Sequence, residues 1–376
     1  MRKVGIYVHF PFCVSKCNYC NFNSYSNKSE MQMDYFHALL KEIEMYGGQK
    51  KIKIDSIFIG GGTPSIMFDG CISTVLSHIR KNFSLTEDCE ITVEANPNSL
   101  NVTKCREWKE AGVNRVSVGL QTTNPNALKI IGRVHGKKEY VEAINALQSV
   151  GINNINTDCL VGLPRQKMSD VRRTLDLVTK LGCKHVSVYS LILEEDTPLY
   201  DMVKSGAVKL PKEEKTLSMY NFALKFLKEK GLHRYEVSNF AKRGCECRHN
   251  LNTWHMHEYL GFGAGAHSFF DNYRYSNVNE IERYIELILN KKEPIANREK
   301  LSKQEKLEEY IMLGLRTADG IDLAEIKDVY GIDLKLTRKK QLENLLKLGL
   351  IKVVYEKISA TDLGFTVLNK IIVELV

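Results

Sequence analysis

The segment YVHFPFCVSKCNYCNFNSY, residues 7–25, carries the clearest chemical signal in this chain. It places Cys13, Cys17 and Cys20 in a C-x3-C-x2-C pattern directly after an apolar run. Cysteine thiolates are the ligands of iron–sulfur clusters, and three closely spaced cysteines can bind three irons of a [4Fe–4S] cube while the fourth iron stays open to a small molecule. The alternatives are buried structural thiols and a zinc site, although zinc requires a fourth protein ligand. The spacing favours the cluster.

The same segment resembles the radical S-adenosylmethionine (SAM) superfamily, whose cluster motif is C-x3-C-x2-C with an aromatic residue, here Tyr19, before the last cysteine. The wider string YVHFPFC…CNYCNF is similar to the HemN/HemW branch, which contains oxygen-independent coproporphyrinogen dehydrogenases and haem chaperones. The resemblance implies that the open iron binds the amino and carboxylate groups of SAM. It also implies that an electron from the cluster cleaves the sulfonium and gives a 5′-deoxyadenosyl radical.

The composition is that of a globular chain in a reducing compartment. Its 376 residues suffice for one large domain and a smaller one, and no apolar run is long enough to span a bilayer. Residues 1–10 run into the cysteine motif without a cleavage site, so we expect no signal peptide and a cytoplasmic protein with reduced thiols. The net charge of +8 is spread along the chain with carboxylates interspersed, which predicts a solvated surface and no specific nucleic-acid binding.

Apolar runs and helical periodicity alternate through the first half of the chain. The predicted strands cover residues 4–10, 54–59, 90–95, 115–120, 154–161 and 185–192. The predicted helices cover residues 36–43, 69–80, 103–111, 138–150 and 168–181. Such β/α units with apolar strands predict an α/β fold with a parallel sheet. The family resemblance implies that this sheet is an open (β/α)6 partial barrel of the radical SAM type, with its site at the C-terminal ends of the strands.

Polar residues and glycines lie at that edge of the predicted sheet. Residues 60–63 (GGGT) follow the second strand, where they either let backbone approach a ligand or form a tight turn. Glu94 ends the third strand, Gln121 ends the fourth, and Asp158 lies late in the fifth. A buried Asp158 needs a hydrogen-bond donor, from a ribose or from a neighbouring chain group.

The family resemblance implies roles for these positions. The GGGTP segment matches one that contacts the methionine amino end of SAM, and Arg133, in IGRVH, matches a contact to the SAM carboxylate or ribose. His9 is interpreted as structural. The expected cofactor contacts are Tyr7, Tyr19, Gly61, Gly62, Thr63, Glu94, Gln121, Arg133 and Asp158.

A second polar cluster, CECRHNLNTWHMH, occupies residues 245–257. Its C-x-C-x-H string could bind a metal, and neutral histidine is a common haem or zinc ligand; the alternative is a loop whose imidazoles bond to backbone. The resembling branch carries an HNxxYW signature linked to haem binding in its chaperone members. Here His249 and Asn250 match that signature, whereas Thr253 replaces the tyrosine. We therefore expect His249 to contact haem, and His267, in YLGFGAGAHS, is a weaker candidate.

The last part of the chain predicts a separate fold. Three helical stretches and a ribbon at residues 350–356 and 358–360 describe a winged helix, a type of domain that often binds DNA. The family places such a domain over the barrel, which implies a lid or docking module. We expect a radical SAM core domain at residues 1–235, a connecting segment at residues 236–300 and a winged-helix-like domain at residues 301–376.

Three functions stay open on the sequence alone: a haem chaperone, an oxygen-independent coproporphyrinogen dehydrogenase, and a related radical SAM methyltransferase. The resembling dehydrogenases carry a further cysteine at the position of Phe22 and a sizeable extension before the cluster loop, and both differences favour the chaperone. The sequence does not settle whether the chain is an enzyme. The expected partners are haem, haem-accepting proteins including membrane-bound ones reached by peripheral contact, an electron donor, and a second copy of the chain in a homodimer.

Overall fold

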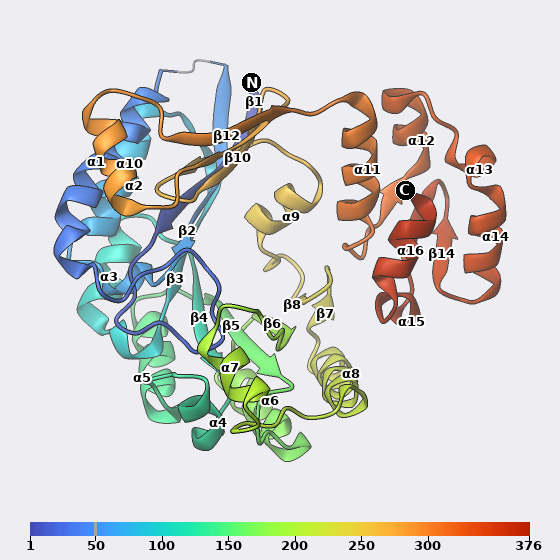
Figure 1. Cartoon of the computed structure of the whole chain (residues 1–376), viewed down its shortest axis with the longest axis horizontal. Helices are drawn as coiled ribbons and strands as arrows, with labels where there is room; N and C mark the ends of the chain where they lie inside the picture. The colour runs from blue at the N-terminus through green and yellow to red at the C-terminus, as the bar shows by residue number, and fades with distance from the viewer. Residues whose placement is uncertain (49–50) are drawn as a thin grey trace.

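The computed structural model describes residues 1–48 and 51–376. Its centre is a curved twelve-stranded sheet with the strand order β12-β11-β10-β9-β1-β2-β3-β4-β5-β6-β8-β7 (Figure 1). Six parallel strands follow one another in chain order through the middle of this sheet. They are β1 (Arg2–Phe10), β2 (Ile52–Gly61), β3 (Leu85–Ala95), β4 (Arg115–Gln121), β5 (Asn154–Val161) and β6 (His185–Ser190). The six predicted strands are thus confirmed.

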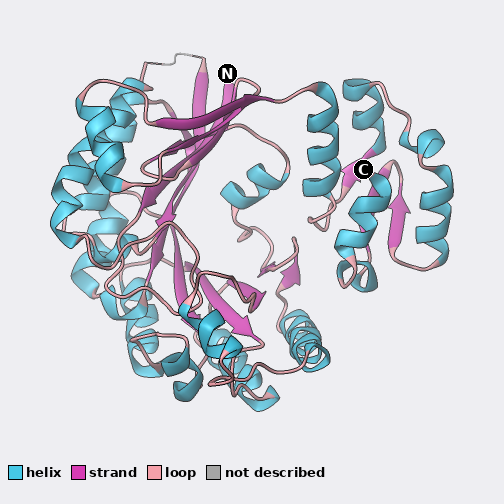
Figure 2. Ribbon diagram, in the orientation of Figure 1, coloured by secondary structure: helices cyan, strands magenta, loops and turns pink. Residues whose placement is uncertain are grey.

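Helices cover the convex face of the sheet, as the apolar strands require (Figure 2). All seven residues of β4 are buried, because helices pack on one side and polar interior groups on the other. The covering helices are α1 (Gln32–Met45), α2 (Cys71–Asn82), α3 (Val102–Glu110), α4 (Pro125–Ile130), α5 (Lys137–Ser149) and α6 (Met168–Lys180). The sequence analysis missed only the six-residue α4 among them.

Residues 236–300, which we expected to connect two domains, largely extend the same sheet. β9 (Tyr259–Phe262) pairs parallel with β1, so β1 lies between β2 and β9. The other added strands are β7 (His233–Arg234), β8 (Asn239–Ala241), β10 (His267–Phe270), β11 (Tyr273–Asn277) and β12 (Ile295–Lys300). Further helices are α7 (Pro198–Lys204), α8 (Glu213–Glu229), α9 (Arg248–Trp254) and α10 (Ile281–Leu289). The sheet ends at β7 and β12, so it is open, as the resemblance implied.

The short helix α9 lies on the concave side of the sheet, opposite the covering helices (Figure 1). There it contacts β2. It thereby brings the predicted His249 cluster inside the curve of the strands.

The C-terminal unit has its own apolar core, in which Leu307, Ile311, Leu345 and Ile371 are buried. The predicted ribbon is confirmed as β14 (Ile351–Val354) paired with β15 (Lys357–Ala360), joined by β13 (Ile321–Asp322). Its helical elements are α11 (Lys303–Gly314), α12 (Leu323–Glu325) with a π turn (Ile326–Tyr330), α13 (Leu334–Thr337), α14 (Lys339–Lys347), α15 (Asp362–Phe365) and α16 (Leu368–Leu375). Three of these helices, α13, α15 and α16, were not predicted from the sequence.

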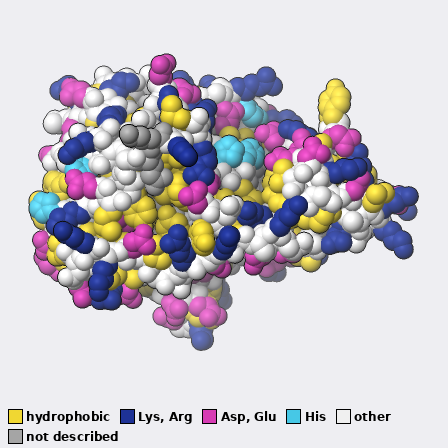
Figure 3. All heavy atoms as spheres, turned by 90° about the horizontal axis from the view of Figure 1, so that it is seen from above, with side chains coloured by type: hydrophobic (Ala, Val, Ile, Leu, Met, Phe, Trp, Pro, Cys, Tyr) yellow, Lys and Arg dark blue, Asp and Glu magenta, His cyan; other side chains and the backbone are white. Residues whose placement is uncertain are grey.

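Charged side chains of both signs alternate over the face shown in Figure 3. This arrangement agrees with the solvated surface expected from the sequence. Ion pairs between described residues join the C-terminal unit to the sheet: Arg274 to Glu309, with nitrogen–oxygen distances of 2.5 and 2.8 Å, and Arg234 to Asp362 at 2.5 Å.

Candidate functional site

The cysteine loop follows β1 and is held by its own backbone. The Cys13 N–H donates to the Tyr25 carbonyl at 2.9 Å, and the Cys20 N–H donates to the Cys17 carbonyl at 3.1 Å. All three cysteines are unbridged and half-buried. Burial raises the pKa of Cys17, Arg133 opposes that rise, and the thiols of Cys20 and Cys13 add to it. Three sulfur atoms therefore share one small, partly buried region.

The number and type of these ligands suit a cluster better than a single zinc ion. Among residues 1–48 and 51–376, no three histidine, cysteine or carboxylate groups converge on one metal position. A mononuclear zinc needs four ligands at about 2.0–2.3 Å, whereas a cube binds each cysteine through a different iron. Bound iron would also keep the thiols deprotonated despite their burial. The three cysteines thus suit the predicted [4Fe–4S] group.

The glycine-rich segment at the end of β2 is hydrogen bonded to the chain that leads into the cysteine loop. The Gly62 N–H donates to the Phe10 carbonyl at 2.7 Å, and the Thr63 N–H donates to the Phe12 carbonyl at 2.8 Å. A Cβ on Gly62 would lie 2.6 Å from the Phe12 carbonyl oxygen, so only glycine permits this approach. Gly62 and Thr63, expected as SAM contacts, therefore use their amides to hold the loop.

Gly61 and Glu94 form a pair at the ends of β2 and β3. Gly61 has φ of 110°, and its N–H donates to Glu94 Oε2 at 3.2 Å. Burial raises the pKa of Glu94 to about 8, the nearby charge of Asp158 adds to the rise, and the Gly61 amide and Arg115 oppose it. Glu94 is consequently protonated at neutral pH until a cation or a further donor reaches it.

Four of the predicted residues line one cavity of about 530 Å³: Tyr7, Gly61, Glu94 and His249. Other residues of its lining are His9, Phe22, Asn23, Thr253, Tyr259, Gly265, His267 and Asn279. The volume lies within the range of small-molecule sites. The weaker candidate His267 is thus at this cavity. His9, interpreted as structural, also lines it, and its ring hydrogen bonds to the Tyr7 hydroxyl at 3.0 Å and to the Asn23 carbonyl at 2.8 Å.

Arg133 ties the cysteine loop to the strand ends. Its Nη1 donates to Asn96 Oδ1 at 2.7 Å, and its Nη2 donates to the Tyr19 hydroxyl at 3.2 Å. Burial works to lower the pKa of Arg133, but Tyr19 and Cys17 hold it above its ordinary value. Its buried Nε has no hydrogen-bond partner within the described residues. Arg133 therefore keeps a free donor beside the cysteine loop, although it does not line the 530 Å³ cavity.

Gln121 and Asp158 lie on neighbouring strands, also outside the lining of that cavity. Gln121 is buried and has φ of 66°, a left-handed conformation that is uncommon outside glycine and often marks functional positions. Asp158 accepts hydrogen bonds from Ser117 Oγ at 3.0 Å and from Asn156 Nδ2 at 2.8 Å. Neighbouring chain groups thus supply hydrogen-bond donors of the kind that a buried Asp158 requires.

His249 is held by two residues that the sequence analysis missed. Its Nδ1 shares a hydrogen bond with Ser56 Oγ at 3.1 Å. Its backbone N–H donates to Glu90 Oε1 at 3.1 Å, and Glu90 also accepts from the Arg248 N–H at 3.0 Å and the Cys247 thiol at 3.5 Å. Glu90 lies in the middle of β3, shortly after Glu87 and Asp88, so its position in the sequence did not distinguish it from these exposed acids.

The imidazole of His249 is neutral at physiological pH. Burial lowers its pKa to about 4, and the positive charge of Arg115 adds to this effect. Because Ser56 occupies Nδ1, the nitrogen left for a ligand is Nε2. Cys247, which belongs to the C-x-C-x-H string considered for metal binding, donates to Glu90 Oε1 at 3.5 Å.

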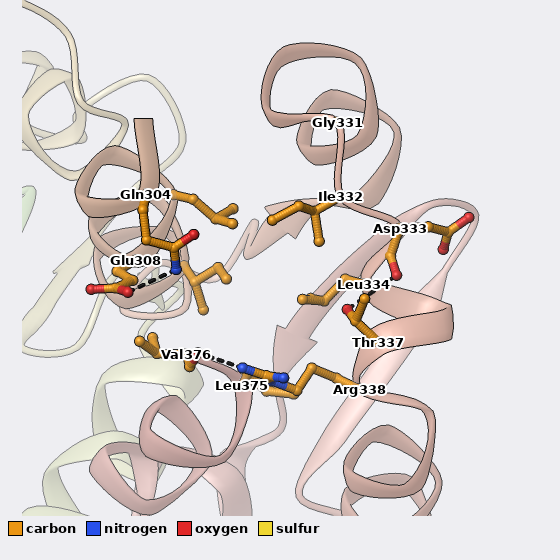
Figure 4. Close-up of a pocket in the computed structure, with 12 residues that line it drawn as sticks. Gln304, Glu308, Gly331, Ile332, Asp333, Leu334, Thr337, Arg338, Leu375 and Val376 are labelled. Carbon is orange, nitrogen blue, oxygen red and sulfur yellow. Dashed lines mark hydrogen bonds between the residues drawn. The ribbon is translucent and has the colours of Figure 1, made fainter. Parts of the chain in front are cut away.

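A second cavity, of about 260 Å³, lies inside the C-terminal unit between α11, α13 and α16 (Figure 4). Its walls are mainly apolar, and Arg338 closes one side by donating to the Val376 carbonyl at 2.7 Å. None of the predicted site residues lines it.

Family comparisons agree with this geometry. The family model of the radical SAM superfamily matches residues 7–178, and that of the HemN C-terminal domain matches residues 301–367. The sheet and the cysteine loop thus define a radical SAM protein, a class that uses a [4Fe–4S] cluster and SAM.

Curated relatives narrow the assignment. The chain is 36% identical over 347 residues to the heme chaperone HemW of Bacillus subtilis, a match that covers 92% of both chains. It is 34% identical over 328 residues to radical S-adenosyl methionine domain-containing protein 1, mitochondrial, of Danio rerio, covering 85% of this chain and 74% of the relative. The chain belongs to the HemW family. The family and fold predicted from the cysteine loop are confirmed.

The solved structure of the coproporphyrinogen III oxidase HemN from Escherichia coli matches with a TM-score of 0.87. That match covers 100% of this chain and 90% of the other, at 22% sequence identity, and so it supports the shared fold alone. Within residues 1–48 and 51–376, no helix combines the length and apolar character needed to cross a bilayer.

Proposed function

We propose that this protein is a haem chaperone, which binds haem and delivers it to acceptor proteins. Relatives from Bacillus subtilis, Lactococcus lactis and Escherichia coli that are 33–36% identical carry the name heme chaperone HemW. The single structural observation that carries the proposal is His249, a neutral imidazole with one nitrogen anchored and the other available at a cavity beside the cysteine loop. Neutral histidine is the commonest protein ligand of haem iron.

In this proposal Cys13, Cys17 and Cys20 hold the [4Fe–4S] cluster, which, when bound, supplies one electron to the sulfonium of SAM. The unpartnered Nε of Arg133 suits a carboxylate or ribose oxygen of SAM, and Glu94 would release its proton to solvent and pair as a carboxylate with the SAM ammonium. The remaining proposed SAM contacts are Tyr7, Tyr19, Gly61, Gly62, Thr63, Gln121 and Asp158. Residues 301–376, with their own core, act as the separate lid or docking domain.

The dehydrogenase function receives no support from the cavity. Phe22, at the position where the resembling dehydrogenases carry a further cysteine, lines the cavity and presents an exposed ring without a thiol. Acceptor identity, peripheral membrane contact, a homodimer and a cytoplasmic location remain predictions.

The test is anaerobic reconstitution with iron and sulfide, followed by haem titration and a coproporphyrinogen decarboxylation assay. We expect about four irons per chain, stoichiometric haem binding and no turnover of the porphyrinogen. His249→Ala should weaken haem binding at least about tenfold and change the Soret absorbance. His257→Ala is the matched control, because that exposed imidazole lies outside the cavity lining. Turnover of the porphyrinogen, or wild-type haem affinity in His249→Ala, would contradict the proposal.

A further inference from the structure

A basic cavity lies at the edge of the sheet where the parallel strands end. Its volume is about 970 Å³, and its walls come from the loops after β4 and β5 and from the segment that enters α8. Arg165, Lys167, Arg173, Lys209 and Lys215 line it, and they come from two segments, residues 165–173 and 209–215. The fold therefore brings two groups of cations together around one cavity.

These cations are largely unneutralised. Asp170 is the only carboxylate among the described residues that line the cavity, and it pairs with Arg173. Asp170 also accepts from the Lys167 N–H at 2.8 Å and from Asn124 Nδ2 at 2.9 Å. Within the described part of the chain, the side chains of the other four cations form no ion pair. Clusters of unpaired charge raise the local concentration of oppositely charged partners.

The loop that carries Arg165 is fixed in a strained form. Arg165 has φ of 59°, and the side chain of Gln166 locks the turn by accepting from the Leu163 N–H at 3.1 Å and donating to the Leu160 carbonyl at 2.8 Å. Left-handed backbone at a non-glycine residue is strained and persists where the surroundings impose it. The exposed guanidinium thus extends from a rigid base.

The basic cavity is joined to the cysteine loop by a small apolar cluster. Tyr19, next to Cys20, packs against the cluster formed by Leu128, Leu163 and their neighbours. The Asn18 N–H donates to the Ile131 carbonyl at 3.0 Å, just past the end of α4. The start of α4 lines the basic cavity, and a six-residue helix is about 9 Å long. A partner bound there therefore lies about the length of α4 from the loop that would hold the proposed cluster.

The lining suits a protein surface better than a small anion. Small-ligand sites use a few buried polar groups placed to fix orientation. Here the buried polar side chains, Gln166 and Asp170, are already hydrogen bonded, and Asp170 is itself negative. Among the described residues, four of the five cations form no ion pair with a buried carboxylate. Charge matching through exposed side chains is typical of brief electron-transfer encounters, whose interfaces are small.

We propose that this basic cavity and its rim dock an acidic, one-electron electron-transfer protein that reduces the cluster. One electron leaves the reduced donor and one enters the oxidised cluster, while no covalent bond forms or breaks. The inference rests on the proposed function, because it requires the iron–sulfur cluster in the cysteine loop.

The test uses the full-length reconstituted protein and photoreduced flavodoxin, an acidic flavoprotein, as the probe. The double variant Lys209→Glu, Lys215→Glu is compared with Lys340→Glu, Lys347→Glu, which makes the same charge change at exposed positions of the C-terminal unit. Loss of the visible cluster absorbance is followed by stopped flow at low and at high salt, once with flavodoxin and once with photoreduced 5-deazaflavin as a small reductant.

We expect the Lys209/Lys215 variant to be reduced by flavodoxin at least about tenfold more slowly at low salt, with a weaker salt dependence. The control variant should match the wild type, and all proteins should react alike with 5-deazaflavin. Equal rates of cluster reduction by flavodoxin in the two variants would overturn the proposed docking site but leave the proposed function standing. Stoichiometric binding of inorganic pyrophosphate in the cavity, without competition against flavodoxin, would do the same. A chain without an iron–sulfur chromophore would overturn the proposed function as well.

Discussion

The hydroxyl of Thr63 donates a hydrogen bond to the sulfur of Cys13 across 3.6 Å. Thr63 ends the glycine-rich segment after β2, and Cys13 opens the cysteine loop after β1. The same threonine accepts from Asn96 Nδ2 at 3.3 Å, beyond the end of β3. Three consecutive strands therefore meet at the first proposed ligand of the cluster.

Replacing Thr63 by valine should lower the reduction potential of the cluster. A hydrogen bond to a ligand sulfur stabilises the more negative, reduced state, so its loss is expected to shift the midpoint by on the order of 20–50 mV to more negative values. Redox titration followed by electron paramagnetic resonance measures the shift. Thr63→Ser keeps the hydroxyl and should retain the wild-type potential; equal shifts in both variants would show that the hydroxyl has no such effect.

Replacing Ser56 by alanine should weaken haem binding about tenfold, because the partner that orients the ligand imidazole is removed. Gly5→Ala provides an independent check, since its new Cβ would lie 3.2 Å from the His249 ring. Haem affinity is read from titration of the Soret band, and thermal denaturation monitors folding. Unchanged haem affinity in both variants would indicate that the orientation of His249 does not matter.

Haem and SAM should weaken each other's binding. Tyr7, Gly61 and Glu94, proposed for SAM, and His249, proposed for haem, line one cavity of about 530 Å³, which is small for two ligands of this size. Saturating SAM is expected to raise the Kd of haem by roughly fivefold or more, and saturating haem must raise the Kd of SAM by the same factor. Anaerobic titrations in both orders check this reciprocity. Independent affinities would place the two ligands in separate sites.

Gly61→Ala should destabilise the protein by roughly 2–4 kcal/mol, because φ of 110° strains an alanine and its Cβ would lie 2.6 Å from the His9 ring. Gly70→Ala is the matched control, since Gly70 has φ of 82° but nothing within 4 Å of the added carbon. The free energies of unfolding come from urea denaturation. A loss no larger than that of the control would show that His9 moves aside freely.

Glu42 should make stability depend on pH. Burial raises its pKa to about 7, although Tyr284, Gly263 and Asn277 donate hydrogen bonds to its carboxylate. Since the folded pKa exceeds the ordinary value of 4.5, the native state holds the proton more tightly. This contribution is complete below pH 4.5 and is lost as the pH rises through 7.

The stability of the wild type relative to Glu42→Gln is therefore expected to fall by on the order of 3 kcal/mol between pH 4.5 and pH 8. Urea denaturation of both proteins at several pH values provides the measurement. A difference that stays constant with pH would mean that Glu42 titrates alike in the folded and unfolded states.

The parallel strands could be predicted because each is an apolar run whose pairing partner is its neighbour in the chain order. The cysteine loop could be predicted because all of its ligands lie within eight residues. β9 was missed, since it has four residues and pairs with β1 across about 250 positions of sequence. No local pattern specifies such a pairing.

The candidate site likewise contains residues that could be predicted from the sequence and residues that could not. Glu94 and Asp158 were visible as acids late in apolar strands, whereas Ser56 and Glu90 reveal their roles only when α9 folds back onto the concave face. The structural role of Gly62 and Thr63 was hidden for a related reason: a glycine-rich turn is compatible both with a ligand contact and with a close approach of two loops, and the sequence does not show that this turn holds the cysteine loop.

The central place of β1 has a consequence for damage by oxygen. β1 is hydrogen bonded to β2 on one side and β9 on the other, and the cysteine loop is closed by backbone bonds between Cys13, Tyr25 and Pro11. These hydrogen bonds join main-chain groups and use no cysteine sulfur. Oxidative loss of the cube is therefore expected to leave this part of the sheet folded, with the three sulfurs still held on one loop.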